Sequence, residues 1–420
     1  MLRRNSMKKD DRIVLYSFIL TVFVVWLHAG EPLFSFVPGQ IAVPGFFALS
    51  GYLFMRGLPG NSGDALGRSA ESSGRYPAAV LFAASDSPRF AAELAAKQSP
   101  AAIPPDDSSA TATGGISRCA CSEAPCACAA LSDTTPEGYR PVASQILDKM
   151  KRRVHTLVIP YLAWNTIYFV IYLAAGKATL AELPEAVLLY RCNPVFWYMF
   201  QLILITIISP VIYFIMKKGR AAALLLLAVI FALAVFYAKL PFHYCNEDAL
   251  FYYCLGAYFS LRGTYGDAQR GRIAQDRSSS ATGTYLPLAL TVAAAAAFLL
   301  VRNLLPPALY NVSEVGCRAA GAAACWFAVS LFHDRYAERC GGTFPVQPWM
   351  QIDFFVYATH YMVIRAVWAL EQAAGLNGSQ TANVITYLVM PAICISAAYG
   401  LSLIMKKYVP KIYSVLTGGR

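Results

Sequence analysis

Ten apolar stretches of helical length run along this chain, and they limit what it can fold into. Roughly 20 apolar residues in a helix cross the hydrocarbon core of a bilayer, where backbone groups must satisfy one another. The sequence therefore predicts an all-α fold, a polytopic membrane helix bundle of about ten transmembrane helices. Two stretches are short, so nine or eleven spans are alternatives. The stretches lie at about 13–29, 42–56, 154–174, 197–216, 221–238, 248–262, 284–301, 318–333, 350–372 and 384–405.

The composition excludes an ordinary soluble protein. Charged residues make up only 14% of the chain and hydrophobic residues 57%, whereas soluble domains carry about a quarter charged residues. The formal net charge of +11 would suit a nucleic-acid partner if the basic residues gathered on one face. They lie instead in short loops between the apolar stretches, so we expect no nucleic-acid binding.

The distribution of basic residues predicts the orientation in the membrane. If the N-terminus is cytoplasmic, 29 of the 35 Lys and Arg residues fall in cytoplasmic segments, five in outer loops and Arg365 within a span. This excess follows the positive-inside rule. We therefore expect a multi-pass protein of the cytoplasmic (inner) membrane with both termini in the cytoplasm. Residues 1–28 begin like a secretory signal but lack a convincing small-residue cleavage site, so we interpret them as the first span.

A long stretch of different composition divides the membrane part of the chain. Residues 57–140 are rich in Ala, Ser, Gly and Pro and show little periodicity, so we expect a disordered cytoplasmic insertion. It separates 1–56, with two spans, from 141–408, with about eight spans. Residues 409–420 are expected to form a cytoplasmic tail. A shorter low-complexity loop is predicted at 262–284.

Four of the 11 cysteines gather in the sequence "CACSEAPCAC", as Cys119, Cys121, Cys126 and Cys128. Zinc sites usually use a wider C-x(2–4)-C spacing, and the surrounding composition offers no fold to hold a metal. The other cysteines lie in or near the spans, where cysteine is an ordinary small apolar residue. We expect no metal site.

Polar side chains within the spans are the first candidates for chemistry, because a polar group in a bilayer is costly. His28 ends the apolar run in "VVWLHAGEP", and Asp353 and His360 lie two helical turns apart in "QIDFFVYATHYMV". Asn165 and Gln201 lie in two further spans. Each could instead be an interior group that joins two helices. Imidazole in a span is rare, so the histidines are the strongest candidates.

A basic cluster comes just before the third span, in "LDKMKRRVHTLVIPYLAWN". It contains Lys149, Arg152 and Arg153, and it permits two interpretations. Basic residues here anchor a helix by the positive-inside rule. They also suit the phosphates of a nucleotide-bearing donor, because arginine offers a planar, bidentate fork. In the second span, "VPGFFALSGYLFMRG" carries small residues for close helix contact and Ser50 for a hydrogen bond across it.

Five segments in this order carry a resemblance to a known family: "WLHA", "PGFFALSGYLF", "KRRVHTLVIPYLAWN", "NPVFWYMFQLILITIISPVIYFI" and "DFFVYATHYMVI". They resemble the acyltransferase 3 family of integral-membrane acyltransferases, over about 12–57 and 145–405. The resemblance implies transfer of an acyl group, commonly acetyl from acetyl-CoA, to a hydroxyl of a cell-envelope glycan or a similar acceptor. Expected partners are acyl-CoA, an envelope glycan or lipid-linked sugar, and membrane lipid.

The resemblance also implies roles for particular residues. His28 matches the family's first-helix histidine, and the basic cluster Lys149, Arg152 and Arg153 matches its cluster before the third span. Tyr357 and His360 match a late Tyr-x-x-His motif.

The chain departs from the family pattern at two places. Ser17 stands where many members have Arg or Lys, eleven residues before the histidine. Phe200 and Gln201 stand where many have an Arg-Asp pair after a tryptophan. These departures leave the subfamily and the acceptor open.

The expected chemistry needs a base, an oxyanion site and a donor site. A sugar hydroxyl is a poor nucleophile, so His28 is predicted to be the general base or to carry the acyl group briefly. Glu31 could orient its ring, although a solvated loop residue is the simpler interpretation. CoA phosphates would bind Lys149, Arg152 and Arg153. The candidates for contacting substrate or oxyanion are Ser50, Asn165, Trp197, Tyr198, Gln201, Tyr357 and His360.

This placement separates donor and base. His28 is expected near the outer face and the basic cluster inside, so the CoA pantetheine arm would have to thread into the bundle.

Two other functions fit part of the pattern. A transporter or flippase for a lipid-linked sugar or small solute would explain the spans, but Asp353 is almost the only intramembrane carboxylate. A non-enzymatic scaffold that recruits partners through 57–140 would explain the insertion but neither histidine.

Overall fold

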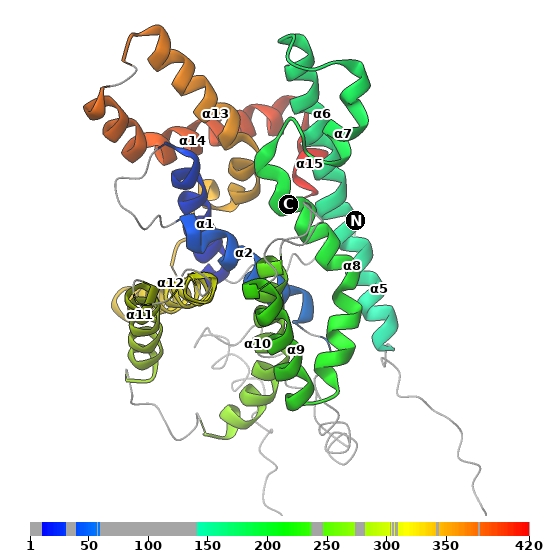
Figure 1. The fold of residues 1–420 in the computed structure, drawn as a ribbon, viewed down its shortest axis with the longest axis vertical. Coiled ribbons are helices and arrows are strands. Elements are labelled where there is room, and N and C mark those ends of the chain that lie inside the picture. The colour runs from blue at the N-terminus through cyan, green and yellow to red at the C-terminus, as the bar shows by residue number, and fades with distance from the viewer. Residues whose placement is uncertain are drawn as a thin grey trace, which may run out of the picture. The chain divides into compact units, whose positions relative to one another are not determined.

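The computed structural model describes most of the chain outside the long insertion, and these residues are almost entirely helical (Figure 1). No β-strand occurs among them, so the predicted all-α class is confirmed. The described residues are 11–30, 39–56, 58, 141–236, 247–273, 282–302, 304, 306, 310–341, 344–376 and 379–419. The predicted disorder of 57–140, the cysteine cluster at 119–128 and Glu31 lie outside the described residues, apart from the buried Leu58.

Each of the ten apolar stretches is helical over nearly all of its described residues. Among the described residues, six segments are long and apolar enough to cross a membrane, namely Asp11–His28, Val142–Ala174, Pro194–Lys217, Tyr285–Arg302, Tyr310–Cys340 and Gln380–Tyr408. A membrane helix bundle therefore fits, while the number ten stays a prediction. The ten helices are α1 (Asp11–His28), α2 (Gly39–Met55), α6 (Ile159–Ala174), α8 (Trp197–Lys217), α9 (Arg220–Phe236), α10 (Glu247–Ile273), α11 (Thr282–Arg302), α12 (Tyr310–Cys340), α13 (Asp353–Ala373) and α14 (Gln380–Tyr408).

The structure adds helices that the apolar pattern did not predict. Helix α5 (Val142–Arg153) continues through one π-helical turn (Val154–Val158) directly into α6, so the basic cluster is itself helical. Short helices α7 (Leu183–Leu188) and α15 (Pro410–Thr417) and the 3₁₀ turns Leu180–Glu182, Pro194–Phe196 and Pro348–Ile352 complete the described part.

Two predicted loops differ from the structure. The loop expected at 262–284 is wrong for its first part, because α10 continues to Ile273 and α11 begins at Thr282. Once a helix has formed, each further residue that is fixed adds one hydrogen bond. Helix α10 can therefore continue beyond the end of its apolar stretch. The expected tail at 409–420 contains α15, which is packed against the bundle: Leu416 is buried, and its carbonyl accepts a hydrogen bond of 3.0 Å from Trp164 Nε1.

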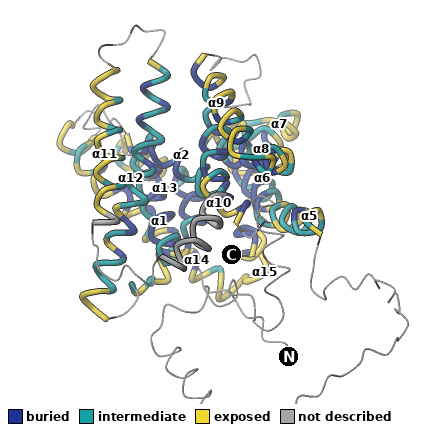
Figure 2. Tube along the Cα trace, turned by 90° about the horizontal axis from the view of Figure 1, so that it is seen from below, coloured by how far each residue is buried: buried dark blue, intermediate teal, exposed yellow. Residues whose placement is uncertain are grey.

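Helices α1 and α2 pack against five of the other long helices. Helix α1 packs against α2, α12, α13 and α14, and α2 also packs against α8, α10 and α12 (Figure 1). Figure 2 shows much of the buried surface on these helices, whereas α11 is largely exposed. The exposed side chains of α11 include Leu286, Leu290 and Leu300, a composition that suits contact with lipid.

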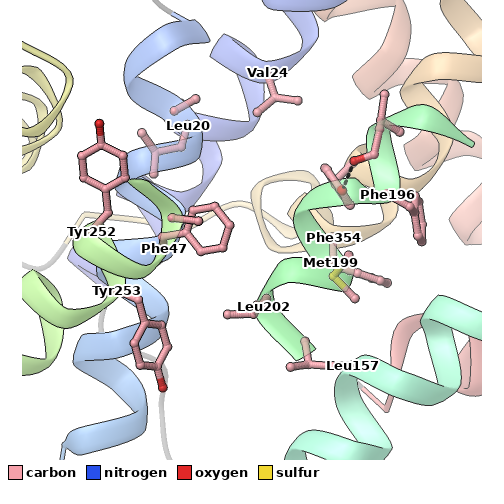
Figure 3. Close-up of a cluster of buried hydrophobic side chains, with 14 of the residues drawn as sticks. Leu20, Val24, Phe47, Leu157, Phe196, Met199, Leu202, Tyr252, Tyr253 and Phe354 are labelled. Atoms are coloured by element: carbon pink, nitrogen blue, oxygen red, sulfur yellow. Dashed lines mark hydrogen bonds between the residues drawn. The ribbon is translucent and has the colours of Figure 1, made fainter. Parts of the chain in front are cut away.

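The inner faces of these helices form a common apolar core (Figure 3). It is rich in aromatic rings, which bury large areas per residue. Contributors include Leu20 of α1, Phe47 of α2, Phe196 before α8 and Tyr252 of α10.

Helices α2 and α10 approach each other closely because each has a glycine at the contact. A Cβ atom on Gly51 would lie 2.0 Å from the Tyr253 carbonyl oxygen, and one on Gly256 would lie 1.8 Å from the Ala48 carbonyl oxygen. In both cases the nearest atom belongs to the backbone, which cannot rotate away as a side chain could. Small residues permit this backbone contact between membrane helices.

We therefore expect Gly256→Ala to destabilise the protein by about 1–3 kcal/mol, the usual cost of overpacking. Thermal unfolding of the detergent-solubilised protein measures it, with Gly400→Ala as control because a Cβ there meets nothing within 4 Å. Equal unfolding midpoints for the two variants would contradict the close contact.

Candidate active site

Two histidines from distant parts of the chain lie side by side. His28 is the last residue of α1 and His360 lies in α13, and their ring centroids are 5.4 Å apart with the planes tilted by 38°. At the other end of the same contact, the rings of Phe18 and Trp349 are 5.1 Å apart. The two helices thus run in the same direction, which brings the histidines to one level. The sequence predicted both residues but not their pairing.

Tyr357 connects His360 to the start of α8. Its hydroxyl donates to the Val195 carbonyl oxygen at 2.5 Å, and its ring stacks on Phe196 with centroids 5.5 Å apart. One turn further along α13, Nδ1 of His360 lies 2.6 Å from the Tyr357 carbonyl oxygen. His360 is fully buried, and its Nε2 has no hydrogen-bond partner among the described residues.

Tyr198 and Ser50 continue the site toward α2. The Tyr198 hydroxyl lies 3.4 Å from Ser50 Oγ, a distance at which either group can be the donor. The Tyr198 ring is 5.8 Å from the Tyr357 ring and 4.7 Å from that of Phe47. Trp197 packs on the same phenylalanine, with centroids 6.3 Å apart. Candidate residues from α2, α8 and α13 therefore meet in one place.

The basic cluster lies at the opposite end of α2. Lys149 Nζ donates to the carbonyl oxygens of Phe54 and Arg56, at 2.7 and 2.5 Å. These carbonyls end α2, where a cation also complements the helix dipole. Arg153 Nη2 lies 3.5 Å from the Ser50 carbonyl oxygen, and Arg152 is exposed. Lys149 thus has a structural contact, while Arg152 presents its charge outward.

A continuous string of contacts joins the basic cluster to the histidine pair. Its members are, in order, Arg153, Ser50, Tyr198, Tyr357, His360 and His28. A Cβ on Gly39 would meet Leu27, so α2 starts beside the end of α1. Phe54 lies 15 residues further on, which is about 23 Å along a helix. The expected separation between His28 and the cluster is therefore present, and side chains of the candidate set fill it.

Three other candidates lie outside this string. Asn165 is buried and its Nδ2 donates to the Val187 carbonyl oxygen at 3.3 Å, next to Tyr161, whose hydroxyl donates to Leu188. Gln201 is buried in α8. Asp353 starts α13, where its carboxylate accepts from the Phe354 N–H at 2.9 Å. Asp353 and His360 lie two helical turns apart on α13, but they do not form one reactive pair.

Ser17, which stands where the family pattern has a basic residue, makes local hydrogen bonds among the described residues. Its hydroxyl donates to the Val14 carbonyl oxygen at 3.1 Å. Its own carbonyl oxygen accepts from Thr21 at 2.9 Å.

Asn193 is a residue that the sequence reasoning missed. It is fully buried two residues before Val195, and neither amide atom has a partner in the part of the chain that the structure describes. An unpaired buried amide is costly, and this one lies two residues before Val195, whose carbonyl accepts the hydrogen bond from Tyr357. The signal was the Asn-Pro dipeptide at the start of "NPVFWYMF", a polar residue placed at the first turn of a span.

Within the described ranges, no group of three His, Cys, Asp or Glu side chains is arranged to hold a metal ion. The ionisable groups that meet at the site are imidazoles and phenols. Hydroxyls and imidazoles therefore lie together within a helical bundle, with a cationic cluster at one end.

The comparison with protein families identifies the class further. Residues 142–405 match the family model Acyl_transf_3, described as an acyltransferase domain. The match covers more than half of the chain, so the chain belongs to the acyltransferase 3 family and is a membrane acyltransferase. This sets the transporter and scaffold alternatives aside. Neither the curated proteins nor the solved structures searched contain a match.

The family match covers the basic cluster, Tyr198, Tyr357 and His360, but it begins after α2. His28 and Ser50 lie outside the family match, and it is their contacts in the structure that place them beside the matched residues.

We expect Tyr357→Phe to leave the buried Val195 carbonyl unpaired and to lower the free energy of unfolding by about 1–3 kcal/mol. Thermal unfolding in detergent measures the loss. Tyr361→Phe is the matched control, because the Tyr361 hydroxyl makes no hydrogen bond to the described residues. A Tyr357→Phe variant as stable as this control would show that the hydrogen bond does not hold α13 to α8.

Proposed function

We propose that this protein transfers an acyl group, acetyl in the simplest case, from cytoplasmic acyl-CoA to a hydroxyl of an envelope glycan or lipid-linked sugar across the inner membrane. The observation that carries the proposal is the string of contacts from the basic cluster to His28. It supplies one end with cations for a nucleotide and the other with imidazole for a hydroxyl. Both termini are proposed to be cytoplasmic, in keeping with the basic loops.

The donor is proposed to bind by its phosphates at Arg152 and Arg153. Arg152 is exposed and Arg153 partly so, and guanidinium forks suit phosphate oxygens. Lys149 adds positive charge while its ammonium holds the end of α2. The pantetheine arm would then follow Ser50 and Tyr198 toward the histidines, carrying the thioester with it.

The acceptor is proposed to meet His28, which is only partly buried at the end of α1. The acceptor oxygen attacks the thioester carbonyl carbon, and its proton passes to His28. The carbon–sulfur bond then breaks, the ester is formed, and the CoA thiolate takes the proton. A carrier role, in which His28 holds the acyl group between donor and acceptor, is the second possibility. When His28 acts as the general base, this catalysis contributes about 10²–10⁴-fold to the reaction rate.

The negative charge on the carbonyl oxygen needs hydrogen-bond donors. The hydroxyls of Ser50 and Tyr198 are the proposed donors, because they lie within the string of contacts. Tyr357 already donates to Val195, so it is better suited to fix the geometry than to bind the oxyanion. Trp197, Asn165 and Gln201 are proposed to shape the surroundings.

His28→Ala is expected to lower acyl transfer by about 10²–10⁴-fold while the protein still inserts and folds. Membranes from a host without envelope acetylation are given labelled acetyl-CoA, and label in glycan or lipid-linked sugar is counted. His155→Ala serves as the control, because His155 is exposed and lies outside the string. Transfer by the His28 variant at the wild-type rate would remove this histidine from the mechanism.

Arg153→Gln is expected to raise KM for acetyl-CoA about tenfold with little change in kcat, since a charge-assisted hydrogen bond contributes about 1.5–3 kcal/mol. A comparison of acetyl-CoA with the thioester of dephospho-CoA separates a loss of phosphate binding from a loss of folding. Wild type should use the dephospho-CoA thioester less well than acetyl-CoA, and the Arg153→Gln variant should show a smaller difference between the two donors. The exposed Lys151→Gln is the control for general loss of charge. Unchanged discrimination in the Arg153 variant would place the phosphates elsewhere.

A further inference from the structure

The two nitrogens of His360 have different surroundings. Nδ1 lies 2.6 Å from the Tyr357 carbonyl oxygen, which can only accept a hydrogen bond, so Nδ1 carries a hydrogen. Nε2 is buried and unpartnered within the described residues. A second proton there would leave an uncompensated charge in a buried place. His360 is therefore a neutral imidazole whose Nε2 is a bare acceptor.

The nearest imidazole is that of His28. A centroid separation of 5.4 Å leaves no space for another side chain between the rings. His28 is partly exposed at the helix end, whereas His360 is enclosed by α13 and by α14, where Cys394 packs against its backbone. One ring is thus partly accessible at the end of α1, and the other is enclosed by protein.

We infer that His360 is a positioning residue for His28: a small rotation of the neighbouring rings would let the bare Nε2, which is unpartnered among the described residues, accept the N–H of His28, and this hydrogen bond would fix the tautomer in which the other His28 nitrogen is free to take a proton. This rests on the proposed function of His28. In a catalytic triad, a carboxylate accepts the N–H of the imidazole and holds it in one tautomer. Here the neutral His360 takes the place of that carboxylate. When His28 takes the acceptor's proton, its charge is shared with His360. The Tyr357 carbonyl in turn stabilises the Nδ1–H of His360.

This assignment differs from an oxyanion role for His360. An oxyanion needs a donor, and the only N–H of the neutral His360 ring is used by Tyr357. His360 also has no exposed surface from which to meet an acceptor sugar. Its contribution is therefore through His28.

The test combines a spectrum with kinetics. Purified protein labelled with ¹⁵N-histidine contains five histidines, and His28→Ala and His360→Phe assign the two signals. In wild type, both rings should be single neutral tautomers, with His360 protonated at Nδ1. In His360→Phe, the His28 signal should change to a mixture of tautomers. A His28 spectrum unaltered by His360→Phe overturns the inference, whether or not the acceptor substrate has been found.

The kinetic arm uses two substitutions of similar size. His360→Phe keeps a ring but removes the acceptor, and should lower kcat about 10²-fold with KM for acetyl-CoA changed less than about threefold. His360→Gln can place an amide oxygen near the Nε2 position, and should recover at least about tenfold of that loss. Equal rates for wild type and His360→Phe, or no recovery with Gln in a stably folded variant, overturn the positioning role. If wild type itself transfers no acyl group, the proposed function fails, and the spectrum alone decides the pairing.

Discussion

The side-by-side packing of α1 and α13 is the contact on which the rest of the site depends. It joins His28 to His360, and it continues as the contact of Phe18 with Trp349 in the 3₁₀ turn that precedes α13. One residue of slip along α1 would turn His28 by about 100° and move it by about 1.5 Å, which would separate the pair. The other end of α1 is tied to α12 by an ion pair of 2.6 Å between Arg12 and Asp334. An exposed pair of this kind contributes little energy, but together with the aromatic contacts it specifies the register.

Helix α2 makes the connection between that pair and the basic cluster. Gly51 and Gly256 let its backbone touch α10, and Lys149 closes its last turn. Lys149 also brings the two borders of the long insertion together, because Arg56 precedes the insertion and Lys149 follows it. Ser50 and Arg153, on either side of the insertion, are held relative to each other by this contact and by their own hydrogen bond.

Much of the fold could be predicted from the apolar pattern, because each stretch of suitable length can bury its backbone groups only as a helix. The individual candidates His28, Ser50, Tyr198 and His360 could also be named from residue type, and Tyr357 from the family resemblance. Their assembly could not, since it depends on helix direction and register over hundreds of residues. Lys149 shows the limit clearly: its charge suggested phosphate, while its ammonium donates to the carbonyls of Phe54 and Arg56 at the end of α2. Asn193 was missed because a single amide has no periodic signal.

Hydrogen-bonding capacity separates the structural polar groups of this site from the chemical ones. The segment from α7 to α8 is irregular, and non-helical backbone within a membrane domain must be satisfied by protein. Tyr161, Asn165 and Tyr357 supply donors to its carbonyls at Leu188, Val187 and Val195. These donors are spent on structure, so they are poor candidates for proton transfer. The bare Nε2 of His360 keeps unused capacity at the point where α1 ends. A buried group with unused capacity costs stability, and the proposed hydrogen bond from the neighbouring His28 ring would offset this cost.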